Sequence, residues 1–268
     1  MSGFKNKIVL ITGGASGIGK IMGQMVLERG SVLVIWDIDR EKTEATRSEL
    51  SSLGRVYSYR IDVSSYDDIK IAIKWVKRNV GVVDILINNA GIVFGGFFYE
   101  YKIPDVLKTI DVNINAPMLI TRELLPDMMK RNSGHICNIS SLAGLLSNPK
   151  MSVYVASKWA MIGWSESLRL EMNRLRKDIR VTTVTPYYIE TGMFKGVRSF
   201  IPALKPEKVA RKIIRGIERN RIIVSMPWSL RFIRFSQGLM PVRFFDWFVG
   251  GLLGMYKTMD HFVGHNKD

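Results

Sequence analysis

The sequence has little cysteine and little histidine. Its 268 residues include one cysteine, Cys137, and three histidines. A single cysteine forms no internal disulfide and cannot build a cysteine-based zinc cluster, and it fits a reducing compartment. Cys137 lies in an apolar run, so we expect a small buried core residue there. The histidines, His135, His261 and His265, show no metal-ligand spacing, and we predict no metal site.

Long apolar runs are also missing. The first residues, MSGFKNK, leave no room for the charged and apolar segments of a secretory signal before the first expected strand. No uninterrupted apolar run reaches the roughly 18–20 residues that span a bilayer, because Arg243 and Asp246 break the longest candidate. We therefore expect a cytoplasmic protein that lies at most on a membrane surface and does not cross it.

Acidic residues are outnumbered, and the basic excess is uneven. The formal net charge is +15, from 39 Lys and Arg against 24 Asp and Glu. Between residues 195 and 243, twelve basic residues face two acidic ones, Glu207 and Glu218, a difference of ten charges. Such a block fits nucleic acid, an anionic membrane surface or a solvated basic face, and composition alone does not choose among them.

Short apolar strands alternate with helical periodicity along most of the chain. This alternation predicts an α/β fold, a single doubly wound Rossmann-type domain with helices on both faces of a parallel sheet. We expect a cofactor-binding and catalytic core at 5–194, and a substrate lid with a helical, aromatic-rich C-terminal extension at 195–268. The seven expected strands are 7–12, 32–36, 56–61, 84–88, 135–139, 180–185 and 221–225.

A glycine-rich turn, TGGASGIG at 12–19, joins the first expected strand to the first helix. Glycine lets the backbone approach a pyrophosphate closely, and a helix N-terminus offers unpaired N–H groups and a positive dipole end. The turn therefore predicts a dinucleotide site at Gly13, Ser16, Gly17, Ile18 and Gly19.

Asp37 stands directly after the second expected strand, eighteen residues beyond Gly19. A carboxylate near this offset accepts hydrogen bonds from the adenosine ribose and repels a 2′-phosphate, so NAD is favoured over NADP. NADP stays open as the alternative, because Lys20 and Arg40 are able to pair with that phosphate. A plain turn role for Asp37 also stays open.

Tyr154 and Lys158 lie four residues apart on one expected helix, and Ser141 lies thirteen residues upstream of Tyr154, after a strand. This spacing places a phenol and an ammonium on one helix face, which favours an acidic hydroxyl able to exchange protons near neutral pH. Each of these residues taken alone is more often an ordinary helix, surface or capping residue.

The motifs together resemble those of the short-chain dehydrogenase/reductase family. The match runs from about residue 5 to 191, in the family's order and spacing. Its motifs are Thr12-Gly13-x-x-x-Gly17-x-Gly19, Asp62-Val63, Asn88-Asn89-Ala90-Gly91, Asn113, Ser141 and Tyr154-x-x-x-Lys158.

The resemblance implies catalytic roles that the chemistry of the side chains supports. Tyr154 would be the general acid/base, and Lys158 would stabilise its phenolate and bind the nicotinamide ribose. Ser141 would orient the substrate oxygen, and Asn113 would hold a water that links Lys158 to solvent.

The resemblance also implies cofactor contacts beyond the glycine turn and Asp37. The implied contacts are Asp62 with Val63 at the adenine, Asn89, Ala90 and Gly91 around the adenosine, and Pro186, Ile189 and Thr191 over the nicotinamide carboxamide.

One departure from the family pattern concerns the substrate. Many members have Pro-Gly where this chain has Pro186-Tyr187, and Tyr188 follows. Bulky aromatic residues narrow this space and make it more apolar. With the WDID motif at 36–39, TGMF at 191–194 and the tail at 253–262, the chain looks most like the branch of retinol dehydrogenases and 17β-hydroxysteroid dehydrogenases. We therefore expect hydride transfer between a nicotinamide cofactor and an apolar, lipid-like alcohol/carbonyl pair: a retinoid, steroid or long-chain alcohol. An NADP-dependent carbonyl reductase and a non-catalytic nucleotide-binding scaffold are the alternatives.

Aromatic and aliphatic side chains alternate with Arg231, Arg234 and Arg243 between residues 227 and 248, a composition typical of a helix in a membrane interface. Three interpretations stay open: a cover over the substrate pocket or a dimer contact, membrane-surface association, and nucleic-acid binding. We predict no nucleic-acid partner, because no nucleic-acid motif accompanies the charge. Our hypothesis is that 227–262 forms an apolar lid that also seats the enzyme on anionic lipid.

The resemblance further implies a homodimer or homotetramer. In the family, the helix that carries the catalytic tyrosine often packs against its counterpart in another subunit, and Trp159, Ile162 and Trp164 suit such a contact.

Overall fold

The computed structural model describes residues 3–252 and 254–263. At its centre is a seven-stranded parallel sheet in the order β3-β2-β1-β4-β5-β6-β7. The order reverses between β1 and β4, which is the place where doubly wound sheets bind their ligands. The strands are β1 (Ile8–Thr12), β2 (Val32–Asp37), β3 (Val56–Arg60), β4 (Ile85–Asn88), β5 (Gly134–Ile139), β6 (Ile179–Pro186) and β7 (Ile223–Met226).

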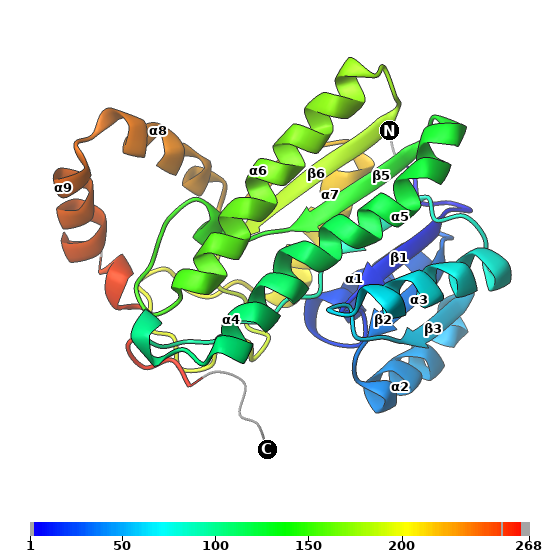
Figure 1. Cartoon of the computed structure of the whole chain (residues 1–268), viewed down its shortest axis with the longest axis horizontal. Helices are drawn as coiled ribbons and strands as arrows, with labels where there is room; N and C mark the ends of the chain where they lie inside the picture. The colour runs from blue at the N-terminus through cyan, green and yellow to red at the C-terminus, as the bar shows by residue number, and fades with distance from the viewer. Residues whose placement is uncertain (1–2, 253, 264–268) are drawn as a thin grey trace.

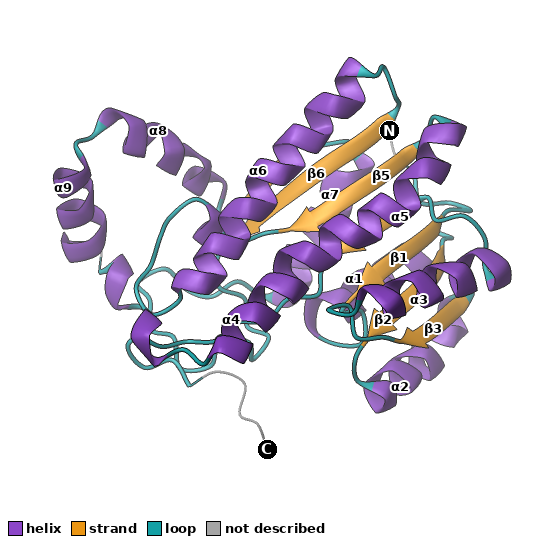
Figure 2. Ribbon diagram, viewed as in Figure 1, coloured by secondary structure: helices purple, strands orange, loops and turns teal. Residues whose placement is uncertain are grey.

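Helices cover both faces of this sheet, as Figures 1 and 2 show. One layer contains α1, α2 and α7, and the other contains α3, α5 and α6. These helices and the short α4 before α5 are α1 (Gly17–Leu27), α2 (Arg40–Leu50), α3 (Tyr66–Asn79), α4 (Ile103–Ile110), α5 (Ala116–Arg131), α6 (Ser152–Arg174) and α7 (Pro206–Glu218).

Alternation along the strands explains the two layers. Successive side chains of a strand point to opposite faces, so Val9 and Ile11 of β1 enter the core beneath α1 and α7, whereas Leu10 enters the core beneath α3 and α5. Each face of the sheet covers the apolar side of the helices packed on it. In α7, for example, Ile213 and Ile217 are fully buried. The predicted doubly wound α/β fold with seven parallel strands is confirmed.

Some strand ends differ from their predicted positions. β4 begins at Ile85, one residue later than expected, and the Asp84 carboxylate just before it accepts a hydrogen bond of 2.9 Å from the Ile8 N–H. β7 begins at Ile223, two residues later than expected. β7 is the last strand of the sheet and α7 covers one of its faces, although both lie within the part predicted at 195–268.

The chain beyond β7 leaves the sheet as an arm and then returns. The arm contains a 3₁₀ turn (Trp228–Phe232), α8 (Ile233–Leu239), α9 (Val242–Phe245) and a π-helical turn (Asp246–Leu252). Figure 1 shows α8 and α9 standing apart from the sheet, at the left. Among the described helices none is both long and apolar enough to cross a bilayer. The side chains of Leu230 and Arg231, together with Leu253, lie outside the described part.

Candidate active site

Three separate segments bring the predicted catalytic residues to the carboxyl edge of the sheet. Ser141 follows β5 and caps a short 3₁₀ turn, where its Oγ accepts a hydrogen bond of 3.1 Å from the Ala143 N–H. Tyr154 and Lys158 lie one turn apart on α6. Asn113 lies in a π-helical turn (Asp111–Asn115) between α4 and α5. The structure thus brings all four residues together.

The Lys158 ammonium lies over the face of the Tyr154 ring, 5.5 Å from its centroid, and both side chains are buried. Its Nζ donates a hydrogen bond of 3.0 Å to the Ile139 carbonyl oxygen. Burial lowers the pKa of Lys158 to about 8. An ammonium with this pKa still carries its charge over most of the neutral range.

The phenol of Tyr154 differs from the expectation drawn from spacing. Burial raises its pKa above the ordinary value, the neighbouring Ser141 hydroxyl acts to lower it, and the nearby Tyr188 phenol raises it further. Burial outweighs the help of the Lys158 ammonium, which lies over the ring and donates its hydrogen bond to a backbone carbonyl. The protein groups alone therefore hold this phenol in its protonated form near neutral pH.

Close packing fixes the Ser141 turn against α6. The Ser140 hydroxyl donates a hydrogen bond of 2.9 Å to the Lys158 carbonyl oxygen. A Cβ at Gly144 would lie 2.5 Å from that same oxygen, so only glycine permits this approach. Ser141 and Tyr154 are held in register by these contacts.

Asn113 is fully buried and links the end of β4 to α6. Its Nδ2 donates to the Ile92 carbonyl (2.9 Å) and to the Ser157 hydroxyl (3.1 Å), and its Oδ1 accepts from the Ile92 N–H (2.8 Å). The side chain therefore positions the loop after β4. Its role in holding a water stays a prediction.

The glycine turn forms a backbone cradle between β1 and α1. Gly13 and Gly17 adopt φ values of +61° and +50°, which favour glycine. A Cβ at Gly19 would lie 2.1 Å from the Gly13 carbonyl oxygen, so the helix start sits tightly on the turn. Asn89 braces it by donating from Nδ2 to the carbonyl oxygens of Thr12 (3.0 Å) and Gly13 (2.9 Å).

This cradle fits a dinucleotide pyrophosphate. α1 starts at Gly17, and the side chain of its N-cap, Ser16, makes no capping hydrogen bond. The first N–H groups of α1, including that of Ile18, are therefore available to an anion at the positive end of the helix dipole. Thr191 lies on the other side, with its Cγ2 3.6 Å from the position of a Cβ at Gly17.

Asp37 ends β2 beside the cradle. Its Oδ2 accepts a hydrogen bond of 3.1 Å from the Ala15 N–H, and its Oδ1 accepts one of 3.2 Å from the Asp39 N–H. Lys20, which the sequence left as a partner for a 2′-phosphate, forms an ion pair of 2.6 Å with Glu49. The carboxylate is thus fixed at the cradle while one of the two competing cations is engaged elsewhere.

The predicted cofactor residues in the loop after β4 lie in two places. Asn89 and Ala90 lie against the glycine turn, whereas Gly91 lies at the catalytic end, where its Cβ would be 3.4 Å from Asn113 Oδ1 and 3.6 Å from Lys158 Nζ. Pro186 is buried at the end of β6, and Ile189 packs partly against the core.

Asp62 and Val63 follow β3. Burial alone would raise the pKa of Asp62, but hydrogen bonds from Ser64 and the charge of Lys108 hold it below its ordinary value. Val63 is 8% exposed and packs in the core, so its side chain contributes little surface to a ligand.

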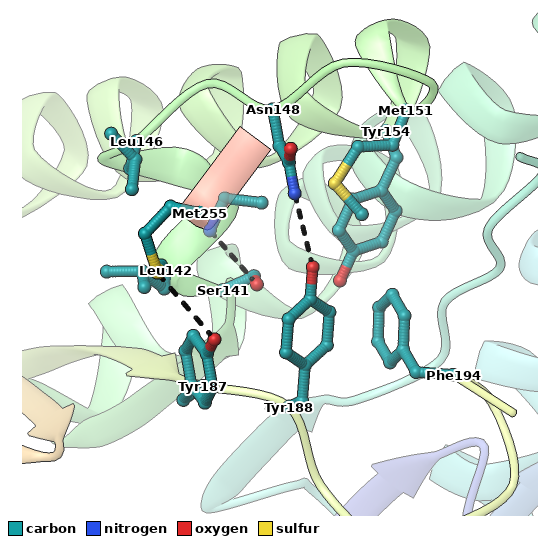
Figure 3. A pocket seen from close by; sticks show the side chains of 11 residues that line it. Ser141, Leu142, Leu146, Asn148, Met151, Tyr154, Tyr187, Tyr188, Phe194 and Met255 are labelled. Carbon is teal, nitrogen blue, oxygen red and sulfur yellow. Dashed lines mark hydrogen bonds between the residues drawn. The ribbon is translucent and has the colours of Figure 1, made fainter. Parts of the chain in front are cut away.

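A pocket opens beside Tyr154 and Ser141 (Figure 3), with about 420 Å³ of empty space including its mouth. Its wall is mostly apolar. The remaining lining residues are Leu142, Ala143, Leu146, Asn148, Met151, Tyr187, Tyr188, Phe194 and Met255. Tyr187 and Tyr188 were predicted beside the substrate, and Met255 lies within the lid predicted at 227–262, whereas Asn148 was not predicted. The sequence carried no distinctive signal for Asn148, because the segment between Ser141 and Tyr154 contains other polar residues, including Ser147 and Lys150.

The returning C-terminal segment closes one side of this pocket. Met259 is buried with Tyr154, and Phe262 packs near Phe194, with their ring centroids 6.3 Å apart. An ion pair of 2.8 Å joins Lys150 to Asp260. The tail segment at the pocket itself is therefore 255–262, while the arm upstream of it packs behind the pocket wall through Phe245.

Two further predictions are affected by the structure. Ile162 is 2% exposed and packs with Leu142 and Tyr187, so it faces the interior and cannot form a subunit contact, whereas Trp159 is 40% exposed. Among the described residues, no three His, Cys, Asp or Glu side chains gather as candidate metal ligands. His265 lies outside the described residues.

A doubly wound sheet with a glycine turn at a helix N-terminus, a carboxylate after β2, and Ser, Tyr, Lys and Asn side chains at one edge fits a nicotinamide-dependent oxidoreductase. The sequence model of the short chain dehydrogenase family matches residues 7–201. The chain therefore belongs to the short chain dehydrogenase family. It is a nicotinamide-dependent oxidoreductase of alcohol/carbonyl pairs with a small-molecule substrate.

Curated relatives extend over nearly the whole chain. It is 37% identical to epidermal retinol dehydrogenase 2 of Mus musculus, over 97% of this chain and 86% of that protein. It is 35% identical to estradiol 17-beta-dehydrogenase 11 of Pongo abelii, over 89% of this chain and 80% of that protein.

Solved structures show the same fold with a bound nicotinamide cofactor. A short chain dehydrogenase/reductase from Burkholderia phymatum in complex with NAD superposes with a TM-score of 0.82 at 26% identity, covering 89% of this chain and 95% of that one. A metagenomic short-chain oxidoreductase in complex with NADP gives a TM-score of 0.71 at 29% identity, covering 84% and 96%.

Proposed function

We propose that the protein interconverts an apolar, lipid-like alcohol with its carbonyl, using NAD in preference to NADP. The observation that carries the substrate class is the pocket beside Tyr154, whose wall is made by Leu142, Leu146, Met151 and Phe194. Binding there removes apolar substrate surface from water, at about 25 cal/mol per Å². Relatives named for retinol and estradiol, both apolar alcohols, support this class.

Tyr154 is the general acid/base of this mechanism. During reduction its protonated phenol gives a proton to the carbonyl oxygen, and during oxidation its phenolate removes the proton of the alcohol. The raised pKa of Tyr154 keeps the phenol in the protonated form that reduction needs, but it makes the phenol a weaker acid and the phenolate that oxidation needs harder to form. The bound nicotinamide supplies the donor or acceptor of the hydride.

Lys158 and Ser141 support Tyr154 in different ways. A charged ammonium near the ring favours the phenolate that oxidation needs, so Lys158 matters most in that direction. The Ser141 hydroxyl lies beside the phenol at the pocket wall and orients the substrate oxygen toward it. Asn113 positions the loop after β4, which carries Gly91 beside the lysine.

The cofactor residues of this proposal are the cradle from Gly13 to Gly19, Asp37, Asp62, the loop at 89–91, and Ile189 and Thr191. NAD is preferred because the Asp37 carboxylate would repel a 2′-phosphate in the place where it accepts ribose hydrogen bonds. The pairing of Lys20 with Glu49 supports the same preference.

The experiment that tests this function is a substrate screen with both cofactors. Retinoids, hydroxysteroids, long-chain alcohols, short polar alcohols and the matching carbonyls are supplied, and the absorbance of reduced nicotinamide is followed. We expect turnover of the apolar classes and its loss by at least about a hundredfold in Tyr154→Phe, with NADH binding retained. Turnover confined to short polar alcohols, or an undiminished Tyr154→Phe, would contradict the proposal.

A second proposal concerns the arm and an anionic membrane surface. Phe235, Leu239, Val242 and Trp247 are each more than half exposed, and they share the arm with basic residues. Exposed apolar residues beside cations are typical of segments that lie in the headgroup region of anionic lipid. The inner side of the arm contributes Phe245 to the cluster that contains Leu142 and Leu146, so membrane binding would place the pocket wall next to lipid.

Vesicle co-sedimentation tests the membrane proposal. We expect binding to anionic vesicles at low salt, weaker binding at high salt, and a several-fold loss in Arg243→Glu. Lys74→Glu on α3, which Figure 1 shows at the far end of the molecule from the arm, is the charge-matched control and should keep the binding. Wild-type protein that stays in the supernatant with anionic vesicles at low salt would contradict it.

We also infer a homo-oligomer through the outer side of α6, where Trp159 is exposed. Light scattering on a sizing column checks this inference. A dimeric or tetrameric wild type and a smaller Trp159→Glu variant are expected, and a monomeric wild type would oppose it.

A further inference from the structure

Asn148 places an amide inside the substrate pocket. It lies in the loop between Ser141 and α6, and Figure 3 shows its amide above the Tyr188 hydroxyl. Its Nδ2 donates hydrogen bonds to the Thr258 hydroxyl (2.7 Å) and to the Tyr188 hydroxyl (3.3 Å). The Tyr188 and Thr258 hydroxyls are 3.0 Å apart, so the three groups form a small polar cluster.

The hydrogen atoms of this cluster can be assigned one by one. The Thr258 hydroxyl lies 3.1 Å from the Met255 carbonyl oxygen, which only accepts, so Thr258 donates there. It must then accept from Asn148 and from Tyr188. Both hydrogens of the Asn148 amide and the Tyr188 hydrogen are thereby used inside the cluster.

One atom of the amide is left over. Asn148 Oδ1 is buried and has no hydrogen-bond partner among the described residues. Turning the amide by 180° exchanges its oxygen and nitrogen, so one amide atom still has no partner. Buried polar atoms are normally hydrogen-bonded, so the unpaired Asn148 atom at the pocket wall needs a partner that the described residues do not supply, either a water or a ligand group.

The rest of the pocket makes this atom selective. Leu142, Leu146, Met151 and Phe194 offer no conventional hydrogen-bonding groups, and Ser141 with Tyr154 serves the reacting oxygen. A pocket that is apolar apart from a few fixed polar groups uses those groups to orient and select its ligand. A substrate oxygen other than the reacting one can bond the unpaired Asn148 atom once the amide, or the packing that now covers it, shifts as the ligand enters.

We propose that Asn148 is a specificity-determining residue that hydrogen-bonds a second oxygen of the substrate. The preferred substrate is then an apolar molecule with two oxygen functions, a diol or hydroxyketone, and not a plain monoalcohol. This inference rests on the proposed alcohol/carbonyl activity and deepens it.

The test compares matched substrates. A monoalcohol and a series of diols on the same carbon skeleton, with the second hydroxyl at different separations, are assayed for kcat/KM with NAD. We expect at least one diol to exceed the monoalcohol by tenfold or more, because a site built to bond a hydroxyl discriminates against the analogue that lacks it. In Asn148→Leu this ratio should fall to about 1, mainly through a higher KM for the diol.

Three controls make the result specific. Ser147→Ala, at the exposed neighbouring position, should keep the wild-type ratio. Tyr188→Phe removes a cluster hydroxyl but leaves the Asn148 amide, and should keep a preference for the diol. NADH fluorescence reports whether each variant folds. If Asn148→Leu binds no NADH, Asn148→Ser replaces it in the test, because the serine side chain is too short to reach the second oxygen of the substrate.

The possible results distinguish a failure of the Asn148 role from a failure of the proposed oxidoreductase function. Equal kcat/KM for the monoalcohol and every diol, or a diol preference that survives in Asn148→Leu and Asn148→Ser, would overturn the role of Asn148 and leave the oxidoreductase intact. No turnover of any alcohol or carbonyl would overturn the proposed function and this inference with it.

Discussion

The ammonium of Lys158 lies 5.5 Å from the centre of the Tyr154 ring, inside the protein. The same helix therefore buries both the group proposed to exchange protons and the charge proposed to assist it. Burial moves their pKa values in opposite directions, with the tyrosine raised and the lysine lowered to about 8. Both shifts favour neutral groups, so the charged forms that catalysis uses are formed at a cost in stability.

Lys158 should make stability depend on pH in a window that can be isolated. Below pH 8 Lys158 is charged in both the folded and the unfolded state, and the folded state carries the full free-energy cost of burying that charge. Between pH 8 and the ordinary value of 10.5 the unfolded chain holds a proton that the native chain has lost, so stability rises with pH. We expect the unfolding free energy of wild type, minus that of Lys158→Met, to increase by about 3 kcal/mol between pH 7 and 11.

Urea unfolding of both proteins across this range measures the difference. Other titrating groups are common to the two chains and cancel. The methionine variant also leaves the Ile139 carbonyl without its donor, which shifts the difference by a constant and leaves its slope. A difference that stays flat from pH 7 to 11 would show that the buried lysine has an ordinary pKa.

Much of this site was predictable from the sequence because it depends on local patterns. Strand and helix periodicity placed the turn at Gly13 to Gly19 and the position of Asp37, and a four-residue spacing placed Tyr154 beside Lys158. The partners within the fold were not predictable. Asn148, Thr258 and Met255 meet only after the tail returns across the pocket, over a separation of more than one hundred residues.

The surroundings of Tyr154 and Ile162 also differ from those that sequence spacing predicted. A four-residue interval says that a lysine and a tyrosine are neighbours, but not that the lysine bonds a β5 carbonyl and that burial dominates the phenol. Ile162 shares α6 with Trp159, but a 3₁₀ turn and the pocket wall cover it. Both outcomes are set by what packs against the helix, which periodicity does not contain.

Asp37→Asn should weaken the discrimination against NADP. The amide oxygen can still accept from the Ala15 N–H, so the substitution removes the charge while keeping the turn. Without the carboxylate, a 2′-phosphate no longer meets a like charge, and we expect the ratio of NADPH to NADH dissociation constants to fall by about tenfold, or 1.4 kcal/mol. Fluorescence titration with both reduced cofactors measures it. An unchanged ratio would mean that Asp37 is only a turn residue.

Gly19→Ala should damage the cofactor cradle. Its Cβ would lie 2.1 Å from the Gly13 carbonyl oxygen and 2.8 Å from Asn89 Nδ2, so the turn must move away from α1. We expect a loss of about 1–3 kcal/mol in unfolding free energy and at least about tenfold weaker NADH binding. Gly238→Ala is the matched helical control, since nothing lies within 4 Å of its Cβ, and it should be neutral or slightly stabilising. Similar behaviour of the two variants would contradict the close approach at Gly19.

Gly95→Ala should loosen the tail that closes the pocket. A Cβ at this position would lie 2.2 Å from Cδ1 of the Phe262 ring, which packs near Phe194, whose own ring meets Tyr154 edge-on at 5.8 Å. Displacing the ring opens the apolar wall, so we expect KM for a large apolar substrate to rise several-fold while NADH binding is unchanged. A double-mutant cycle with Phe262→Ala identifies the cause. If the ring is what Gly95 accommodates, Gly95→Ala adds nothing once Phe262 is alanine, because the clash has been removed. Additive effects of the two substitutions would place the effect of Gly95 elsewhere in its loop.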